Sequence, residues 1–247
     1  MHTESERAGY QFLKQTAVLG DQKSHGNEPL TKICGICEPQ QDMITLPPPS
    51  EIISDPFLLR DTLDNRQTIR DYSDEEIYKW ELSLLLHYTQ GVREKKDQSN
   101  FRTVPSAGAL HPFETIIVIN RISGIEPGLY RYLPLDHALV REVCHSGDKD
   151  AVASACRSSS LVTSSAVTFL WTAVPARMIW KFGSRGWRYL FIEAGHICQN
   201  LYIISSALNL GVCAIGSYKD DEINCILGIN GTDEFCIYMA SVGRIKE

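Results

Sequence analysis

The sequence predicts an α+β fold built around one large core. Some segments are apolar and β-branched, as buried strands are, and others carry apolar residues at helical spacing. The chain has 247 residues with 43% hydrophobic composition, which is enough to bury one sizeable core. We therefore expect helices and strands to share a single domain.

The first 45 residues differ in composition from the rest. They mix Gly, Gln, Ser, Lys and Glu with little periodicity, and they lead into prolines at positions 47, 48 and 49. Consecutive prolines favour an extended connector. We predict an N-terminal arm over residues 1–45 and one folded domain over residues 46–247.

The first helix of the domain is predicted after Ser73. Ser73 and Glu76 have the spacing of a capping box, and the apolar residues from Ile77 onward fall on one helical face. Gly91 can end this helix. The segment 92–101 is charged and unpatterned, so it is predicted to be a loop of the kind that often borders an active site.

Four strands are predicted further along the chain. Residues 114–120 and Val167–Ala173 are rich in apolar and β-branched side chains and are expected at the centre of a sheet. Strands near residues 212–215 and 235–242 complete it. Helices are expected between these strands.

Two helices are predicted between positions 175 and 211. Pro175 suits the first turn of a helix that carries Lys181. A long helix follows and closes near Gly211. Its markers at helical spacing are Phe191, Ala194, Cys198, Leu201, Ser205 and Leu208.

Charge and hydropathy exclude some partners. The net charge is −6, and no run of Lys or Arg exceeds two residues, so a nucleic acid is not expected as a partner. The N-terminus is polar and the apolar runs are much shorter than a membrane span. We expect no membrane partner and a cytoplasmic location.

The eight cysteines are expected to be reduced. Cys198, Cys213 and Cys236 lie in apolar periodic segments, where a free thiol packs as a small hydrophobic group. Cys34 and Cys37 form a CxxC pair, but a structural zinc site normally needs a second pair, which the sequence lacks. We expect an ordinary thiol pair and no metal, although a site shared across a dimer stays open.

The segment RQTIRDY has the pattern of an anion-binding strand. Arg66, Thr68 and Arg70 alternate, so an extended chain would point all three side chains to one side. Arginine binds phosphate oxygens in a bidentate manner, and each such bond contributes roughly 1.5 to 3 kcal/mol. The alternative is a solvated strand.

The segment RTVPSAGALHP contains small and rigid residues that let backbone amides approach a flat ring. These residues are Pro105, Ser106, Ala107 and Gly108, and Ser106 also offers a hydroxyl. The alternative is an ordinary tight turn.

Taken in order, several segments resemble those of the nitroreductase-like flavoproteins, and more narrowly the SagB-type dehydrogenases. The segments are RQTIRDY, LSLLLHYTQGV, VPSAGALHPFE, EPGLYRY, KFGSRGWRY and EAGHICQNLY. The resemblance implies a nitroreductase-like fold, with a central and mostly antiparallel sheet flanked by helices. It also implies an FMN cofactor and a homodimer.

The resemblance implies roles for several residues. Arg66, Thr68 and Arg70 would hold the FMN phosphate and ribityl chain, with Thr68 in place of the usual serine. The segment from Pro105 to Gly108 would border the isoalloxazine ring. The turn CAIGS would bring the backbone amides of Ala214, Ile215 and Gly216 to the reactive edge of the ring, where amides stabilise developing negative charge.

Lys181 is the candidate catalytic residue. Relatives that oxidise azoline rings resemble this chain here but carry a Lys-Tyr pair, whereas this chain has Lys181 and Phe182. A lysine with a pKa lowered by burial could act as a base. Phenylalanine cannot relay a proton, so Tyr189 or Tyr218 would have to supply a phenol; the alternative for Lys181 is a surface cation.

Three neighbouring residues keep two interpretations each. Arg185 and Arg188 could contact substrate or flavin, or form surface ion pairs. His196 lies on the long helix and is expected to be a satisfied core residue rather than a catalyst.

The sequence as a whole predicts an FMN-dependent oxidoreductase. It would transfer hydride between NAD(P)H or an organic substrate and a small acceptor. Two alternatives remain: an azoline dehydrogenase of a ribosomal peptide pathway, which Phe182 disfavours, and a catalytically silent scaffold that binds a flavin or another ligand.

Overall fold

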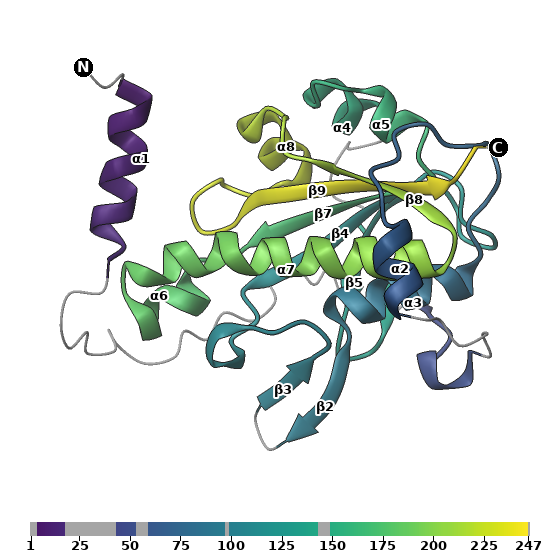
Figure 1. Cartoon of the computed structure of the whole chain (residues 1–247), viewed down its shortest axis with the longest axis horizontal. Helices are drawn as coiled ribbons and strands as arrows, with labels where there is room; N and C mark the ends of the chain where they lie inside the picture. The colour runs from purple at the N-terminus through teal and green to yellow at the C-terminus, as the bar shows by residue number, and fades with distance from the viewer. Residues whose placement is uncertain (1–3, 18–42, 53–58, 97–98, 143–148, 247) are drawn as a thin grey trace.

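The computed structural model describes residues 4–17, 43–52, 59–96, 99–142 and 149–246. Its main feature is a seven-stranded sheet with the order β1-β6-β5-β4-β7-β9-β8, in which all neighbouring strands are antiparallel (Figure 1). The strands are β1 (Met43–Thr45), β4 (Phe113–Ile119), β5 (Gly128–Leu133), β6 (Ala138–Arg141), β7 (Val167–Ala173), β8 (Leu210–Ile215) and β9 (Phe235–Arg244). A separate hairpin joins β2 (Val92–Lys96) to β3 (Ser99–Arg102).

Helices cover both faces of the sheet (Figure 1). They are α2 (Leu59–Asn65), α3 (Lys79–Gln90), α4 (Lys149–Ala155), α5 (Ser160–Thr163), α6 (Ala176–Phe182), α7 (Arg185–Ala207) and α8 (Asp220–Leu227). Helix α1 (Glu4–Gln15) precedes the domain, and Pro49–Glu51 and Ala107–Ala109 form short 3-10 turns, η1 and η2. The expected α+β fold, with an antiparallel sheet flanked by helices, is confirmed.

The sheet separates two hydrophobic cores. On β4, Phe113, Ile117 and Ile119 face the core that includes α3 and α7, whereas Ile116 and Val118 face the core that includes α4 and α8. Alternate residues of a strand point to opposite faces, so a strand covered on both sides must be apolar throughout. This explains why every residue of β4 and β7 is buried, and it confirms the two predicted central strands.

Helix α7 crosses one face of the sheet. Its 23 residues give a length of about 35 Å. The predicted long helix is confirmed, except that Phe191 is 56% exposed and the buried stripe begins at Leu190 instead. The helix before it, α6, begins directly after Pro175, as predicted.

The predicted start of the helix after Ser73 is wrong. Helix α3 begins at Lys79, and its first turn is capped by Glu81, whose carboxylate accepts a hydrogen bond from the Tyr78 amide at 2.8 Å. The preceding residues are held outside the helix because Ile77 forms a bridge with Ile122. The helix ends at Gln90, directly before Gly91, as predicted.

Two further expectations need correction. Residues 92–96 and 99–101 belong to the paired strands β2 and β3 rather than to a loop. Within the predicted arm, Glu4–Gln15 is helical, and Figure 1 shows α1 standing apart from the sheet beyond the α6 end of α7. The division of the chain at residue 45 stays a prediction.

Three cysteines are free and buried, as the sequence predicts. Cys198, Cys213 and Cys236 are free and buried, while Cys34 and Cys37 lie outside the described residues. Within the described ranges, His, Cys, Asp and Glu form no cluster suited to a metal ion. No described helix combines the length and the apolar character that a bilayer crossing requires.

Candidate functional site

The segment RQTIRDY lies along the outer edge of β8. Thr68 forms a parallel bridge with Val212, and the Ile69 amide donates to the Val212 carbonyl at 2.9 Å. Because β8 is the last strand of the sheet, its free edge can accept this extended segment. The predicted extended conformation is therefore present at Thr68.

Two glycines allow the close approach of this segment. A Cβ atom on Gly211 would lie 2.7 Å from Ile69 Cγ2, and one on Gly243 would lie 2.7 Å from Tyr72 Cγ. The Tyr72 hydroxyl donates to the Ile69 carbonyl at 2.9 Å and also bonds Ser241 Oγ at 2.8 Å. The segment is thus packed directly on the backbones of β8 and β9.

Tyr202 of α7 joins this segment to the CAIGS turn. Its hydroxyl bonds Thr68 Oγ1 at 3.3 Å and accepts the Ala214 amide at 3.0 Å. The Arg66 guanidinium lies over its ring, 5.5 Å from the centroid. We call Arg66, Thr68, Ala214 and Tyr202 the Tyr202 group.

Arg70 takes a different position from Arg66. It lies close enough to the Cys213 thiol to act on its pKa: burial raises this pKa, and the charge of Arg70 offsets part of the rise. Arg66, Thr68 and Arg70 were expected to point to one side. Arg66 and Thr68 do meet at Tyr202, whereas Arg70 lies against β8.

Arg66 and Tyr202 of this group border a cavity of about 420 Å³. Its walls also include Asp64, Ser206 and Asn209. Among the described residues, neither Arg66 nor Arg70 forms an ion pair with a carboxylate. Guanidinium groups without a carboxylate partner, next to a hydroxyl, form a donor set that suits a phosphate.

The CAIGS turn offers less than the sequence predicts. The Ala214 amide is already bonded to Tyr202, and the Ile215 side chain is buried in the core on the α8 side of the sheet. Gly216 is exposed, and a Cβ there would meet only Tyr238, at 3.9 Å. The backbone at Gly216 is thus open to a flat ring.

The second group of predicted residues meets at the PSAG turn. Gly108 has a left-handed backbone with φ 65°, and a Cβ atom on it would lie 2.8 Å from Lys181 Nζ. Pro105 and Gly108 are exposed, while Ser106 and Ala107 are partly buried. Lys181 therefore stands over Gly108, but its side chain is exposed, so the burial expected for a base is not present in the single chain.

Glu193 of α7 contacts the backbone of the PSAG turn. Its carboxylate accepts the Ala107 amide at 2.7 Å, and the Ser106 hydroxyl lies close enough to influence its pKa. Burial raises its pKa, and these two donors lower it in part. We call Ser106, Ala107, Gly108, Lys181 and Glu193 the Glu193 group.

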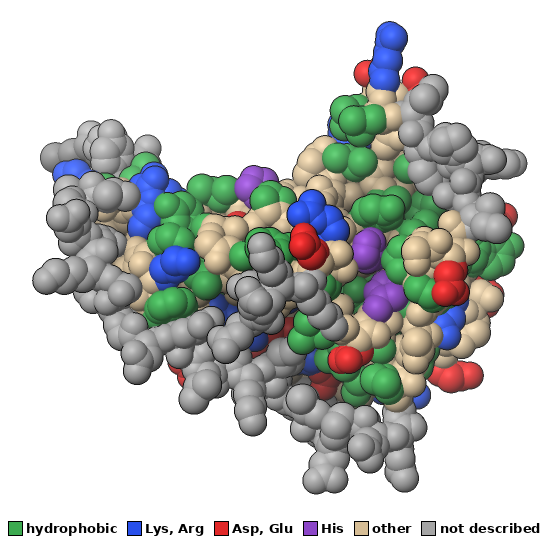
Figure 2. Space-filling model, turned by 90° about the horizontal axis from the view of Figure 1, so that it is seen from below, with side chains coloured by type: hydrophobic (Ala, Val, Ile, Leu, Met, Phe, Trp, Pro, Cys, Tyr) green, Lys and Arg blue, Asp and Glu red, His purple; other side chains and the backbone are tan. Residues whose placement is uncertain are grey.

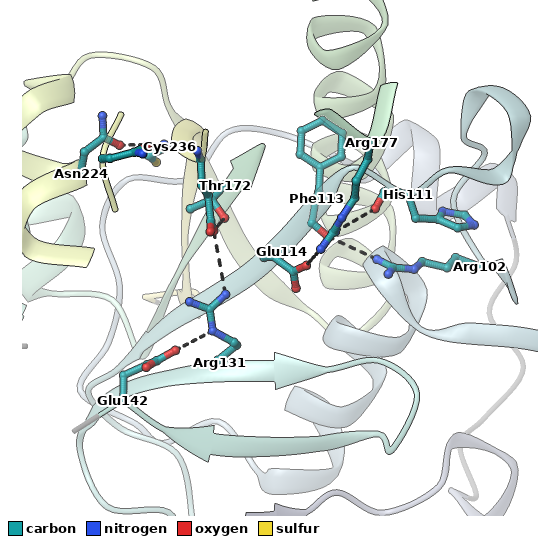
Figure 3. Close-up of polar contacts among 12 residues, drawn as sticks. Arg102, His111, Phe113, Glu114, Arg131, Glu142, Thr172, Arg177, Asn224 and Cys236 are labelled. Carbon is teal, nitrogen blue, oxygen red and sulfur yellow. Dashed lines mark hydrogen bonds and ion pairs between the residues drawn. The ribbon is translucent and has the colours of Figure 1, made fainter. Parts of the chain in front are cut away.

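Two partly buried arginines hold the end of the same segment in place (Figure 3). Arg177 of α6 pairs with Glu114 at 2.6 Å and donates to the His111 carbonyl at 3.3 Å. Arg102 donates to Gln90 at 2.5 Å, and burial lowers its pKa to about 10. Arg177 lies one helical turn before Lys181, so this network fixes α6 relative to the PSAG turn.

A second ion pair extends the network across the sheet (Figure 3). Arg131 of β5 pairs with Glu142 at 2.6 Å and lies 3.9 Å from Glu234. Glu234 also accepts the Thr172 hydroxyl. These contacts lie within the fold and do not reach the PSAG turn.

Phe182 and Tyr189 lie together near Lys181, and Tyr218 lies apart from them. Phe182 packs edge-to-face on Tyr189 with centroids 5.0 Å apart. Tyr218 packs against the other core, on the far side of the sheet from Phe182 and Tyr189. Of the two phenols considered, Tyr189 therefore lies near Lys181 and Tyr218 does not.

Arg185 and Arg188 contact the N-terminal segment. Arg188 donates to the Leu13 carbonyl at 3.0 Å and to Thr16 Oγ1 at 2.9 Å, and Arg185 donates to the Thr16 carbonyl at 3.2 Å. These contacts are hydrogen bonds within the chain, whereas contacts with substrate or flavin, or surface ion pairs, were expected. His196 is exposed, so its expected place in the core is wrong.

The two groups share one helix but do not touch. Glu193 and Tyr202 are nine positions apart on α7, which is about 14 Å along the axis. The sequence predicted residues of both groups but missed Glu193 and Tyr202. A carboxylate on the buried side of a periodic helix was the available signal for Glu193.

The surface seen in Figure 2 carries mixed side chains. Lys and Arg occur in small groups separated by apolar and acidic residues. On this face there is no single basic patch of the kind that a phosphate backbone attracts.

A family model described as the nitroreductase family matches residues 63–244. A Methanocaldococcus jannaschii protein named as a nitroreductase is 34% identical over 190 residues, which cover 75% of this chain and 90% of that protein. A solved Anabaena variabilis protein, also named as a nitroreductase, is 31% identical with a TM-score of 0.64. That match covers 76% of this chain but only 38% of that one.

Two more distant structures share the fold. The Escherichia coli microcin synthetase McbBCD complex, with truncated pro-MccB17 bound, gives a TM-score of 0.64 at 16% identity, covering 96% of this chain and 87% of that one. A Desulfovibrio desulfuricans protein solved in complex with FMN gives 0.54 at 16% identity, covering 79% and 89%.

Proposed function

The chain belongs to the nitroreductase family, and from this we propose that it is an FMN-dependent oxidoreductase. It would transfer hydride between NAD(P)H or an organic substrate and a small acceptor. The observation that carries the proposal is the convergence of Arg66, Thr68 and Ala214 on Tyr202. The FMN-bound Desulfovibrio protein of the same fold adds support for the cofactor.

The residues present fit FMN. Arg66, Thr68 and Arg70 would hold its phosphate and ribityl chain, because they combine a hydroxyl with two cations that have no carboxylate partner among the residues the structure describes. The turn from Pro105 to Gly108 would border the ring. Of Ala214, Ile215 and Gly216, the exposed Gly216 offers the most accessible backbone to the ring edge.

When bound, FMN would supply the two-electron redox chemistry. Lys181 is the proposed catalytic residue, since its amine stands over the exposed Gly108 and can reach a substrate there. An exposed ammonium group at that place would orient an electron-rich or anionic substrate. Tyr202 and Glu193 would keep the two ends of the site in place from one rigid helix.

A narrower SagB-type role, as an azoline dehydrogenase acting on a ribosomal peptide, is the second candidate. The shared fold with the microcin synthetase complex, over 96% of this chain, favours it. Phe182 argues against this role because phenylalanine has no proton to relay. A phenol is nonetheless close by, since the Tyr189 ring packs against Phe182. A silent scaffold is disfavoured because, within the described part of the chain, neither Arg66 nor Arg70 has a carboxylate partner.

We also propose a cytoplasmic homodimer without nucleic-acid or membrane partners. Phe191 and Ile192 of α7 are 56% and 47% exposed, and such apolar side chains suit an interface.

The proposal predicts that Arg66→Ala combined with Arg70→Ala strips FMN from a folded protein. Two charge-assisted bonds of roughly 1.5 to 3 kcal/mol each would be lost, so the Kd for FMN should rise at least about a hundredfold. Fluorescence titration with FMN measures this, and circular dichroism checks the fold.

A matched control removes the same charge elsewhere. Arg60→Ala combined with Arg157→Ala changes two exposed arginines and should leave the Kd within about threefold. Equal FMN affinity in both double variants would refute the phosphate assignment.

A further inference from the structure

The loop 106–111 is held in an unfavourable conformation. Gly108, Ala109 and His111 have φ values of 65°, 54° and 46°. Glycine adopts the left-handed region freely, whereas alanine and histidine do so at a cost in free energy. Such backbone persists only where surrounding contacts hold it.

Glu193 supplies the contacts that hold this loop. Its carboxylate accepts the Ala107 amide at 2.7 Å and lies near the Ser106 hydroxyl, which lowers its pKa in part. Ser106 Oγ in turn accepts the His111 amide at 3.0 Å. One side chain of α7 therefore ties together both ends of the strained stretch.

Burying the Glu193 carboxylate is unfavourable in free energy if only side-chain packing is considered. It is 4% exposed, and both of its named partners are uncharged donors. A buried carboxylate without a cation is disfavoured compared with an apolar side chain of similar size. Its contribution is therefore to the geometry of the loop rather than to the stability of the helix.

The loop geometry determines what lies beneath Lys181. A Cβ on Gly108 would be 2.8 Å from Lys181 Nζ, so the amine and the loop backbone are in close contact. On the other side, Arg177 fixes α6 to Glu114 and to the His111 carbonyl. A movement of the loop would change the environment of the amine while α6 stays in place.

We propose that Glu193 is a positioning residue, which holds the loop 106–111 in its strained conformation and so keeps Gly108 beneath the Lys181 amine. The inference rests on the proposed function, in which this loop and Lys181 border the FMN ring. It adds a residue that acts through the loop and not on the substrate.

The first test uses the protein without FMN. Its lysine amines are reductively methylated with ¹³C, and the Lys181 resonance is assigned by its loss in Lys181→Arg. Glu193→Ala should shift this resonance because the loop is released, whereas Glu193→Gln keeps an acceptor oxygen for the Ala107 amide and should leave it in place. Gln199→Ala, on the exposed face of the same helix, is the control.

The second test adds FMN. Glu193→Ala should change the visible circular dichroism of bound FMN and raise its Kd about tenfold or more, because small displacements in a site have large effects. Glu193→Gln should restore both values. Glu193→Ala with the wild-type Lys181 resonance and the wild-type FMN spectrum would overturn the proposal.

Two outcomes need separate treatment. If Glu193→Ala fails to fold, Ser106→Ala decides, since it removes one donor to Glu193 from a partly buried side chain. An unshifted Lys181 resonance in that variant refutes the positioning role. If the wild type binds no FMN, the proposed function fails, and the Lys181 resonance still tests Glu193.

Discussion

His111 is surrounded by positive charge. Its carbonyl accepts Arg177 at 3.3 Å, and its ring nitrogen Nε2 bonds the Asn100 carbonyl at 2.9 Å. Burial, followed by the charges of Arg102 and Arg177, lowers the pKa of His111 to about 4. The histidine is therefore neutral in the folded protein at physiological pH.

This low pKa predicts acid sensitivity. Between an ordinary pKa of 6.5 and the folded value of about 4, the unfolded state binds the additional proton, so the free energy of unfolding decreases as the pH falls through this window. The decrease due to His111 should be at most about 3 kcal/mol. Chemical denaturation at pH 7 and pH 4.5 measures it.

The comparison between variants isolates His111 from other titrating groups. His111→Asn tolerates the left-handed backbone and should lose less stability between the two pH values than the wild type. His196→Asn, at an exposed position of α7, should behave as the wild type does. Parallel curves for His111→Asn and the wild type would exclude His111 as the source.

The sequence led to the residues proposed for the site but not to those that hold them in place. Arg66, Thr68, Gly108 and Lys181 were proposed from their types, their spacing and the family resemblance. Glu193 was not, because a helical period gives the buried stripe but does not tell what a carboxylate in it will contact. Its partners lie 86 positions earlier in the chain, and only tertiary structure brings them together.

At the scale of elements, the edge of β8 positions the proposed phosphate-binding segment. RQTIRDY adds to this edge through the bridge of Thr68 and Val212, and Ile69 packs directly on Gly211. The side chain of Ile69 lies so close to Gly211 that it leaves no room for a Cβ atom at position 211. The segment therefore depends on a glycine in the neighbouring strand.

Gly211→Ala should separate the segment from β8. The added Cβ would lie 2.7 Å from Ile69 Cγ2 and 2.8 Å from Ile69 Cβ, and relief of such overpacking typically costs about 1 to 3 kcal/mol. Urea denaturation measures the loss of stability, and FMN titration measures the expected loss of affinity. Gly9→Ala adds the same methyl group where nothing lies within 4 Å and should leave both unchanged.

Elements were predictable where local pattern and tertiary burial agree. The strands β4 and β7 are buried on both faces, and their sequences are predominantly apolar, with the buried polar residues Glu114 and Thr172 paired inside the fold. The β2–β3 hairpin was missed because its sequence, VREKK followed by SNFR, shows no apolar alternation. The start of α3 was misplaced because the pairing of Ile77 with Ile122 overrides the local capping signal at Ser73.

At the scale of the whole molecule, α7 links the parts of the proposed site. It presents Glu193 to the PSAG turn and Tyr202 to the segment RQTIRDY. The sheet beneath it supplies β8, whose edge receives that segment, and β4, whose Glu114 fixes α6. A nitroreductase-family fold thus brings together residues that lie more than 130 positions apart in the chain.

FMN binding in the site formed by these elements can be measured directly. The visible absorption spectrum is recorded from protein purified without added cofactor, and any chromophore is then released and identified. We expect a yellow protein that holds, or takes up, about one FMN per chain. A colourless protein that fails to take up FMN would refute the proposed cofactor and favour the silent scaffold.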